Sequence, residues 1–312
     1  MSKYNIHADF AKYEKFGLPM TPWLMPLINK ALAGAFDMVK PTEGVKVTRR
    51  KIKGYQDGLI DVTLFEPVAV ETKAPCLVYL HGGAFTFRAA PYLKTLICNY
   101  AAKTPCKIVY VDYRLAPKHA FPVGVEDCYA AFDWVHQNAD ELGINKTKIA
   151  IGGDSAGGAL AAAVNLMARD RGCATACFQM LIYPVTDARQ STGSIKKFVD
   201  TPMWNSRQTE KMWKLYLKDG LPIKRDYASP MEAASFDGMP SSYIEVAEFD
   251  CLRDEGINFA KALQKSGAQI ELNETAGTVH GFEISQKSDV VHQIIEKRIE
   301  ALKKAFKNST AS

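Results

Sequence analysis

Short apolar runs alternate with amphipathic patterns along most of the chain. The mostly apolar runs occupy residues 76–80, 107–111, 148–151, 178–183, 243–246 and 270–272. Such runs are typical of strands that are covered on both faces. Between them, apolar residues at three- and four-residue spacing predict helices over residues 93–103, 125–138, 156–169, 254–266 and 290–307. This alternation predicts an α/β protein with a mostly parallel central sheet and helices on both faces.

Other segments do not follow this alternation. Residues 45–53 and 60–65 alternate apolar with polar positions around a Gln-Asp-Gly turn, which predicts an antiparallel pair. Residues 1–42 are helical in pattern but precede the first strand, and residues 191–225 insert large aromatic side chains where a short loop would be enough. We therefore expect one main domain of residues 43–190 and 226–312, with a helical cap, or lid, of residues 1–42 and 191–225.

Composition narrows the class of protein. The 312 residues include 47% hydrophobic and 10% aromatic residues, so the chain has a core to bury and is not disordered as a whole. No stretch approaches the roughly 18 consecutive apolar residues of a membrane span. The first residues are polar where a signal peptide would be apolar, and the number of cysteines, seven, is odd. We expect a soluble, cytoplasmic protein without a disulfide framework.

Neither nucleic acid nor a metal ion is an expected partner. The net charge of +5 is modest, and the basic clusters at residues 49–51 and 303–304 have no interleaved aromatic residues. Cys173 and Cys177 are close in sequence but lack the second pair of ligands that a zinc site requires. We expect solvated basic surfaces and cysteines in packing roles, with no cofactor and no membrane partner.

A glycine-rich turn between a predicted strand and a predicted helix carries a candidate nucleophile. Residues 153–158 read Gly-Asp-Ser-Ala-Gly-Gly and contain the pattern Gly-x-Ser-x-Gly around Ser155. In such a strand-turn-helix the serine is exposed on a sharp turn, and the helix N-terminus favours developing negative charge. A phosphate loop would need a Gly-Lys-Ser/Thr ending or Gly-x-Gly-x-x-Gly spacing, and neither is present. We interpret Ser155 as a nucleophile.

A second glycine motif, His-Gly-Gly-Ala-Phe at residues 81–85, follows an earlier predicted strand. A serine hydrolase needs backbone N–H donors for the oxyanion of its tetrahedral intermediate, each worth about 3 to 4 kcal/mol. Gly82 and Gly83 can bring their N–H groups close because they lack side chains, and Ala156 supplies a third donor. We expect these three residues to form an oxyanion hole, and His81 to hold the loop by hydrogen bonding.

Together with later motifs, these segments resemble the hormone-sensitive-lipase-like family of α/β-hydrolases, the bacterial carboxylesterases with a capped active site. The matching segments are His-Gly-Gly at 81–83, Asp-Tyr-Arg-Leu-Ala-Pro at 112–117, Gly-Asp-Ser-Ala-Gly-Gly at 153–158, the acidic segment 248–256 and Val-His-Gly-Phe at 279–282. The resemblance extends from about residue 75 to the C-terminus. It implies an α/β-hydrolase fold and a serine carboxylic-ester hydrolase.

The order of nucleophile, acid and histidine along hydrolase chains leaves two histidines as candidate bases. His280 follows a predicted strand, whereas His292 lies in the amphipathic C-terminal helix, so we identify His280 as the base. Asp250 lies just beyond the end of a predicted strand and is favoured as the acid, with Asp254 as the alternative. The resemblance also points to Asp250, although here Cys251 replaces the proline usual at the next position.

Substrate choice depends on the pocket that the expected cap helps to line. Its candidate residues are Phe85, Met203, Trp204 and Phe282, an apolar and aromatic set that suits an acyl chain. The resemblance implies short to medium acyl esters, and members of that family often form homodimers through the sheet edge. The same triad would also serve an acetyl-sugar, lactone or amide hydrolase. A non-catalytic receptor is disfavoured, because plant hormone receptors of this fold have lost the histidine that is retained here as His280.

Three positions depart from the family pattern. Ala84 replaces the frequent third glycine of the oxyanion loop, Arg88 places a cation near the mouth of the pocket, and Lys118 replaces the usual glutamate. None of these differences removes a catalytic group. Arg114 is expected to anchor its loop through a buried carboxylate, for which Asp127 is the candidate.

Overall fold

The computed structural model describes residues 3–13, 17, 19–221 and 223–309. The predicted cap and main domain also include residues 1–2, 14–16, 18, 222 and 310–312, which lie outside the described residues. The described residues form one eight-stranded sheet in the order β1-β2-β4-β3-β5-β6-β7-β8. The strands are β1 (Val45–Lys53), β2 (Leu59–Pro67), β3 (Ala74–Leu80), β4 (Lys107–Asp112), β5 (Ile144–Asp154), β6 (Gln179–Ile182), β7 (Ser242–Phe249) and β8 (Ile270–Val279).

The sheet is antiparallel at one side and parallel elsewhere. β1 pairs with β2, and β2 with β4, in antiparallel fashion, whereas every other pair of neighbours is parallel. Five of the six predicted apolar runs fall within one of these strands, and the sixth, residues 178–183, extends one residue beyond each end of β6. This agreement confirms the predicted α/β class. One expectation was wrong, because the start of β8 is not covered on both faces. Leu272 is 37% exposed, in keeping with the position of β8 at the edge of the sheet.

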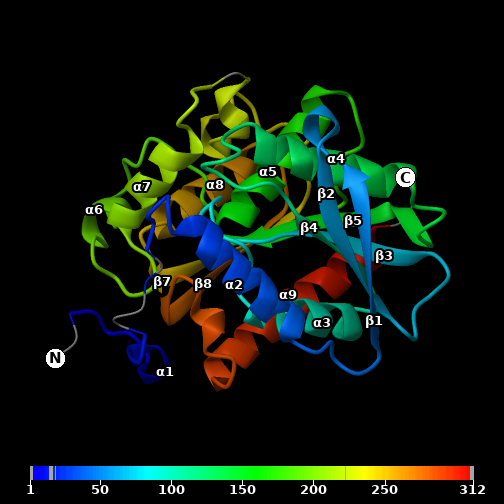
Figure 1. Cartoon of the computed structure of the whole chain (residues 1–312), viewed down its shortest axis with the longest axis horizontal. Coiled ribbons are helices and arrows are strands. Elements are labelled where there is room, and N and C mark those ends of the chain that lie inside the picture. Colours follow the sequence, from blue (N-terminus) through cyan, green and yellow to red (C-terminus); the bar gives the residue numbers. More distant parts are fainter. Residues whose placement is uncertain (1–2, 14–16, 18, 222, 310–312) are drawn as a thin grey trace.

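Helices cover both faces of this sheet (Figure 1). The helices are α1 (Ala8–Ala11), α2 (Met25–Met38), α3 (Tyr92–Lys103), α4 (Val123–Gln137), α5 (Ala156–Asp170), α6 (Gly193–Lys197), α7 (Ser206–Tyr216), α8 (Arg253–Lys265) and α9 (Asp289–Asn308). Side chains of α4, α5 and α8 join one buried cluster, and those of α3 and α9 join another. Among the helices in the described ranges, none is long and apolar enough to cross a membrane.

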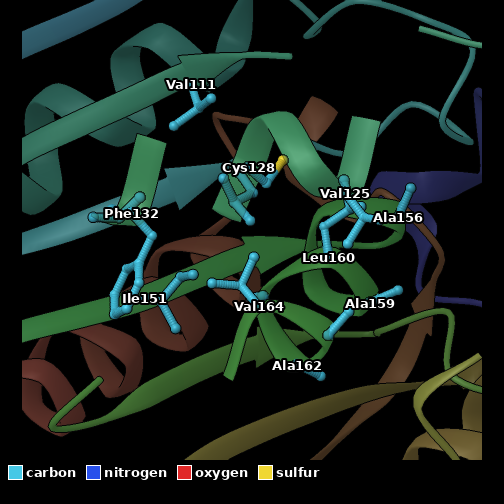
Figure 2. Packing of buried hydrophobic residues seen from close by; sticks show 14 of the residues in the cluster. Val111, Val125, Cys128, Phe132, Ile151, Ala156, Ala159, Leu160, Ala162 and Val164 are labelled. Carbon is cyan, nitrogen blue, oxygen red and sulfur yellow. The ribbon is translucent and has the colours of Figure 1, made fainter. Parts of the chain in front are cut away.

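Side chains of the central strands alternate between these two clusters. In β3, Val78 joins the cluster of α4 and α5, whereas Leu77 and Tyr79 join the cluster of α3 and α9. Figure 2 shows part of the first cluster, in which side chains of α4 and α5 pack together with Val111 of β4 and Ile151 of β5. Burial on both faces explains why the central strands are continuous apolar runs in the sequence.

The two segments expected to form a cap contact each other and the loops that follow the strands. The Tyr4 hydroxyl donates to Asp200 at 2.6 Å, which joins the N-terminal segment to the connection between α6 and α7. The ring of Tyr216 on α7 stacks on Phe85, which follows β3, with the centroids 3.8 Å apart. Figure 1 shows α6 and α7 together at the periphery of the molecule. The division into a main domain and a cap stays a prediction.

Candidate active site

Ser155 occupies a sharp turn between β5 and α5. Its backbone has φ 54° and ψ −119°, a conformation that is strained for a residue with a side chain. The Ser155 N–H donates to the carbonyl of Ile182 at 2.8 Å, and the Ser155 carbonyl accepts from the N–H of Val185 at 3.2 Å. These bonds to β6 and to the segment that follows it hold the turn at the carboxyl end of the central strands.

The glycines on either side of Ser155 are required by the close approach of β3. A Cβ on Gly153 would lie 2.2 Å from the carbonyl oxygen of Leu80, and a Cβ on Gly157 would lie 2.0 Å from the same atom. Both distances are far below any real contact of a Cβ atom. The spacing Gly-x-Ser-x-Gly therefore follows from the backbone of β3 passing directly beside the turn.

His280 and Asp250 form a chain of hydrogen bonds that begins at Ser155. The Nε2 atom of His280 lies 2.8 Å from the Oγ atom of Ser155, and the Nδ1 atom lies 2.6 Å from the Oδ2 atom of Asp250. Asp250 follows β7 and His280 follows β8, so two neighbouring strand ends supply these residues. Because the buried Asp250 carboxylate accepts from Nδ1–H, the hydrogen bonds leave Nε2 unprotonated toward the serine hydroxyl.

The other acidic residues near the end of β7 have different partners. Asp254 accepts from the N–H of Ser194 at 2.7 Å. Glu255 is buried and accepts from two N–H groups of the segment after β6, and its burial raises its pKa well above the usual value. The structure therefore brings Asp250, and not Asp254, to His280.

The loop after β3 corrects the sequence prediction at Gly82. The N–H of Gly82 donates to the Oδ1 atom of Asp154 at 3.0 Å, and the same oxygen accepts from the hydroxyl of Tyr79 at 3.0 Å. A Cβ on Gly82 would lie 2.2 Å from the other carboxylate oxygen of Asp154, so the two residues are in close contact. The predicted role of Gly82 as an oxyanion donor is wrong, because the neighbouring carboxylate already takes its N–H.

Three backbone N–H groups beside Ser155 are available instead. Within the part of the chain that the structure describes, the N–H groups of Gly83, Ala84 and Ala156 have no acceptor. Gly83 and Ala84 line the same cavity as Ser155, and Ala156 is the first residue of α5. Sequence reasoning missed Ala84, although its place directly after the two glycines of the His-Gly-Gly-Ala-Phe motif was a usable signal.

Two titratable groups support this loop. Burial lowers the pKa of His81 to about 4, so its imidazole is neutral, and its Nδ1 atom lies 2.6 Å from the carbonyl oxygen of Gly82. This contact confirms the predicted hydrogen bond from His81 to its loop. Burial and the nearby Glu283 raise the pKa of Asp154 to about 6, although the hydrogen bonds from Gly82 and Tyr79 lower it.

Arg114 anchors the loop after β4, as the sequence predicted. Its Nε and Nη2 atoms donate to the two carboxylate oxygens of Asp127 at 2.8 and 2.7 Å. The Asp127 side chain is fully buried, and it also accepts from the backbone N–H of Tyr55 at 2.9 Å. The bidentate pair explains why this segment contains an arginine. The Arg114 side chain is bonded to Asp127 and makes no hydrogen bond to Ser155.

A cavity of about 410 Å³ opens beside Ser155. Met203 and Trp204 line it, but Phe85 and Phe282 do not, which corrects the pocket prediction at two positions. Phe85 is buried against α7, and Phe282 is fully buried in the cluster of α3 and α9, so both rings fill the core instead. Arg88, which the sequence placed near the mouth of the pocket, also lines the cavity. Further lining side chains that the sequence did not indicate include Leu32, Phe87, Tyr92, Tyr183 and Gln208.

A buried ionic network lies next to the histidine loop and was not identified from the sequence. Arg298 of α9 is fully buried, and its Nη2 atom lies 2.5 Å from a carboxylate oxygen of Glu245 and of Glu283. The Tyr183 hydroxyl donates to Glu283 at 2.6 Å, and the Tyr183 ring packs on His280 with the centroids 4.4 Å apart. The available signal was a charged residue within the apolar stripe of α9.

Comparison with known proteins gives consistent matches. A family model described as the α/β-hydrolase fold matches residues 77–284. Carboxylesterase NlhH of Mycobacterium tuberculosis is 36% identical over 235 residues, which cover 73% of each chain. An arylesterase of Saccharolobus solfataricus is 31% identical over 88% of this chain and 86% of its own. The solved structure of a bacterial heroin esterase superposes with a TM-score of 0.88 at 31% identity, covering 97% of this chain and 98% of that one.

Proposed function

Because this chain belongs to the hormone-sensitive-lipase-like family of α/β-hydrolases, we propose that it is a carboxylesterase with Ser155, His280 and Asp250 as its catalytic triad. The observation that carries the proposal is the unbroken chain of hydrogen bonds from the Ser155 hydroxyl to the buried Asp250, at 2.8 and 2.6 Å. The serine end of this chain meets the cavity, where an ester would bind. The relatives named as esterases support the same substrate class.

In the proposed mechanism, the Oγ atom of Ser155 attacks the ester carbonyl carbon while the Nε2 atom of His280 takes the hydroxyl proton. The carbonyl oxygen becomes an oxyanion in a tetrahedral intermediate. The protonated His280 then gives its proton to the departing alcohol, and an acyl-enzyme forms on Ser155. Water attacks this acyl-enzyme by the same steps and releases the carboxylic acid. Asp250 holds the imidazole in orientation and stabilises the imidazolium.

We assign the oxyanion hole to the N–H groups of Gly83, Ala84 and Ala156. The support is that these donors have no acceptor within the described ranges, whereas the N–H of Gly82 is already bonded to Asp154. Preorganised donors of this kind contribute about 3 to 4 kcal/mol each to the stability of the transition state. Ala84 serves as well as the family's glycine here, because the backbone N–H is the donor.

The cavity supports short to medium acyl esters as substrates. Its volume of about 410 Å³ is near the lower end of the roughly 300 to 1,000 Å³ found for small-molecule pockets. Leu32 from residues 1–42 and Met203 and Trp204 from residues 191–225 line it beside Ser155. Their contribution supports the proposal that these two segments act as a cap that selects the substrate.

The proposal is tested with aryl esters of fatty acids from acetate to decanoate and with the anilide of butyric acid as an amide. We expect the wild type to hydrolyse short and medium esters best, and Ser155→Ala to lose about 10⁴-fold or more of kcat. Ser266→Ala, a serine at the end of α8, is the matched control and should keep the wild-type rate. Absence of ester turnover by the wild type would refute the proposal, and faster turnover of the anilide would make the chain an amidase.

A further inference from the structure

Asn29 of α2 is bonded to the loop that carries two of the proposed oxyanion donors. Its Nδ2 atom donates to the carbonyl of Thr86 at 2.9 Å, and its Oδ1 atom accepts from the N–H of Arg88 at 2.9 Å. One side-chain amide thus pairs with a backbone acceptor and a backbone donor that lie two residues apart, as a neighbouring strand would. Two simultaneous bonds fix both the position and the tilt of residues 86–88 relative to α2.

Residues 86–88 are in turn packed against Gly83. The N–H groups of Thr86 and Phe87 both donate to the Gly83 carbonyl, at 2.9 and 2.7 Å. The carbonyl oxygen of Phe87 approaches so closely that a Cβ on Gly83 would lie 2.2 Å from it. Because these contacts leave no space between the two parts of the loop, a displacement of residues 86–88 also displaces Gly83 and its N–H.

The loop between these contacts is strained and depends on its surroundings. Ala84 and Phe85 have φ values of 56° and 58°, in the left-handed region that residues with side chains rarely adopt. Each such residue costs on the order of 1 to 2 kcal/mol and persists only where other contacts hold it. The Phe85 ring is held by the stacked ring of Tyr216 on α7, and the following residues are held by Asn29 on α2.

The same helix also reaches the cavity. Leu32 lies three residues after Asn29 and lines the cavity together with Ser155 and Gly83. Side chains three residues apart lie on the same face of a helix, so one face of α2 contacts both the cavity and the loop. A movement of α2 would therefore change the wall of the cavity and the position of the loop together.

We propose that Asn29 is a positioning residue for ester hydrolysis, which holds the N–H groups of Gly83 and Ala84 where the oxyanion forms. The inference rests on the proposed function, because it concerns the same reaction. The oxyanion exists only after the serine has attacked, so loss of this support weakens binding of the transition state more than binding of the substrate. The inference also gives the N-terminal segment a role in catalysis beyond covering the cavity.

The test compares Asn29→Ala and Asn29→Asp with the wild type. For Asn29→Ala we expect a fall in kcat of roughly 10- to 100-fold, the size of effect that follows a displaced catalytic group, with KM almost unchanged. Asn29→Asp keeps the acceptor for the Arg88 N–H but loses the donor to the Thr86 carbonyl, so its kcat should be intermediate. Lys30→Ala, at the exposed neighbouring residue of α2, is the matched control and should behave as the wild type.

Binding of an arylboronic acid distinguishes positioning from a general loss of folded protein. The boronate forms a tetrahedral adduct with the serine, so its affinity should fall by the same factor as kcat in both Asn29 variants. Titration of reactive serine with a fluorophosphonate, run to completion, corrects each rate for the amount of folded enzyme. If wild type hydrolyses esters but Asn29→Ala keeps kcat and boronate affinity within about twofold, this inference alone is refuted. If the wild type neither hydrolyses esters nor reacts with the fluorophosphonate, the proposed function and this inference fail together.

Discussion

Arg298, the buried arginine of α9, gives the sharpest prediction about the stability of the fold. The side chains of Arg298, Glu245 and Glu283 are 1%, 0% and 3% exposed. Burial lowers the pKa of Arg298, but Glu245, Tyr100 and Glu283 together raise it well above its usual value, so the arginine stays charged. The variant Arg298→Met keeps most of the side-chain volume and leaves two buried carboxylates without their shared partner.

Removing one member of a buried ion pair costs about 3 to 5 kcal/mol, because the remaining charge cannot be solvated. Each carboxylate keeps one tyrosine donor, Tyr243 for Glu245 and Tyr183 for Glu283, both at 2.6 Å. We therefore expect a loss of about 4 kcal/mol, a large part of the roughly 5 to 15 kcal/mol that stabilises a typical domain.

Urea unfolding followed by circular dichroism measures this loss. The control is Lys297→Met, which removes an exposed lysine from the preceding position of α9 and should cost less than about 1 kcal/mol. The triple variant Arg298→Met, Glu245→Gln, Glu283→Gln removes the charges together and should recover most of the stability. A change below about 1 kcal/mol in Arg298→Met would refute the reasoning.

Two further predictions concern the turn that holds the nucleophile. Gly157→Ala should destabilise the protein by more than about 2 kcal/mol, because the new Cβ would lie 2.0 Å from the Leu80 carbonyl oxygen. Gly34→Ala is the control and should be neutral or stabilising, because its Cβ would have nothing within 4 Å. Thermal unfolding of the two variants measures the difference. The pKa of Asp154 is about 6 in the folded protein, above the roughly 3.9 of an aspartate in an unfolded chain. This carboxyl group therefore stabilises the fold at low pH, and its contribution is lost as the pH rises from about 4 to 6. Asp154→Asn should therefore gain stability relative to the wild type over that interval, by up to about 3 kcal/mol in urea unfolding, and a difference that is constant with pH would contradict this.

The sequence predicted most of the fold because the signals were local. Apolar runs and helical spacing place every central strand and the long helices, since burial on both faces leaves a clear pattern. The turn at Ser155 and the positions of Asp250 and His280 were also predictable, because each motif lies at a strand end and parallel strands end at one edge. The residue types themselves, a serine, an aspartate and a histidine, indicate the chemistry that they would perform together.

The missed features depend on contacts between segments far apart in the chain. Nothing near Gly82 in the sequence shows that Asp154 takes its N–H, since the two residues meet only when β3 and β5 pair. Phe85 was predicted to line the pocket because it is an aromatic residue next to the glycine motif. Its backbone is left-handed, and its ring packs on α7 instead. Asn29 carried no signal at all, because its role comes from two backbone atoms of another segment.

The central claim is that Ser155 is the nucleophile and is activated by His280. A fluorophosphonate forms a covalent adduct with an activated serine, and mass spectrometry of peptides from the labelled protein identifies the modified residue. The account predicts one adduct, on Ser155, that is absent from Ser155→Ala and forms at least about 100-fold more slowly in His280→Ala. An adduct on a different residue, or one that forms on Ser155 at an unchanged rate in His280→Ala, would contradict it.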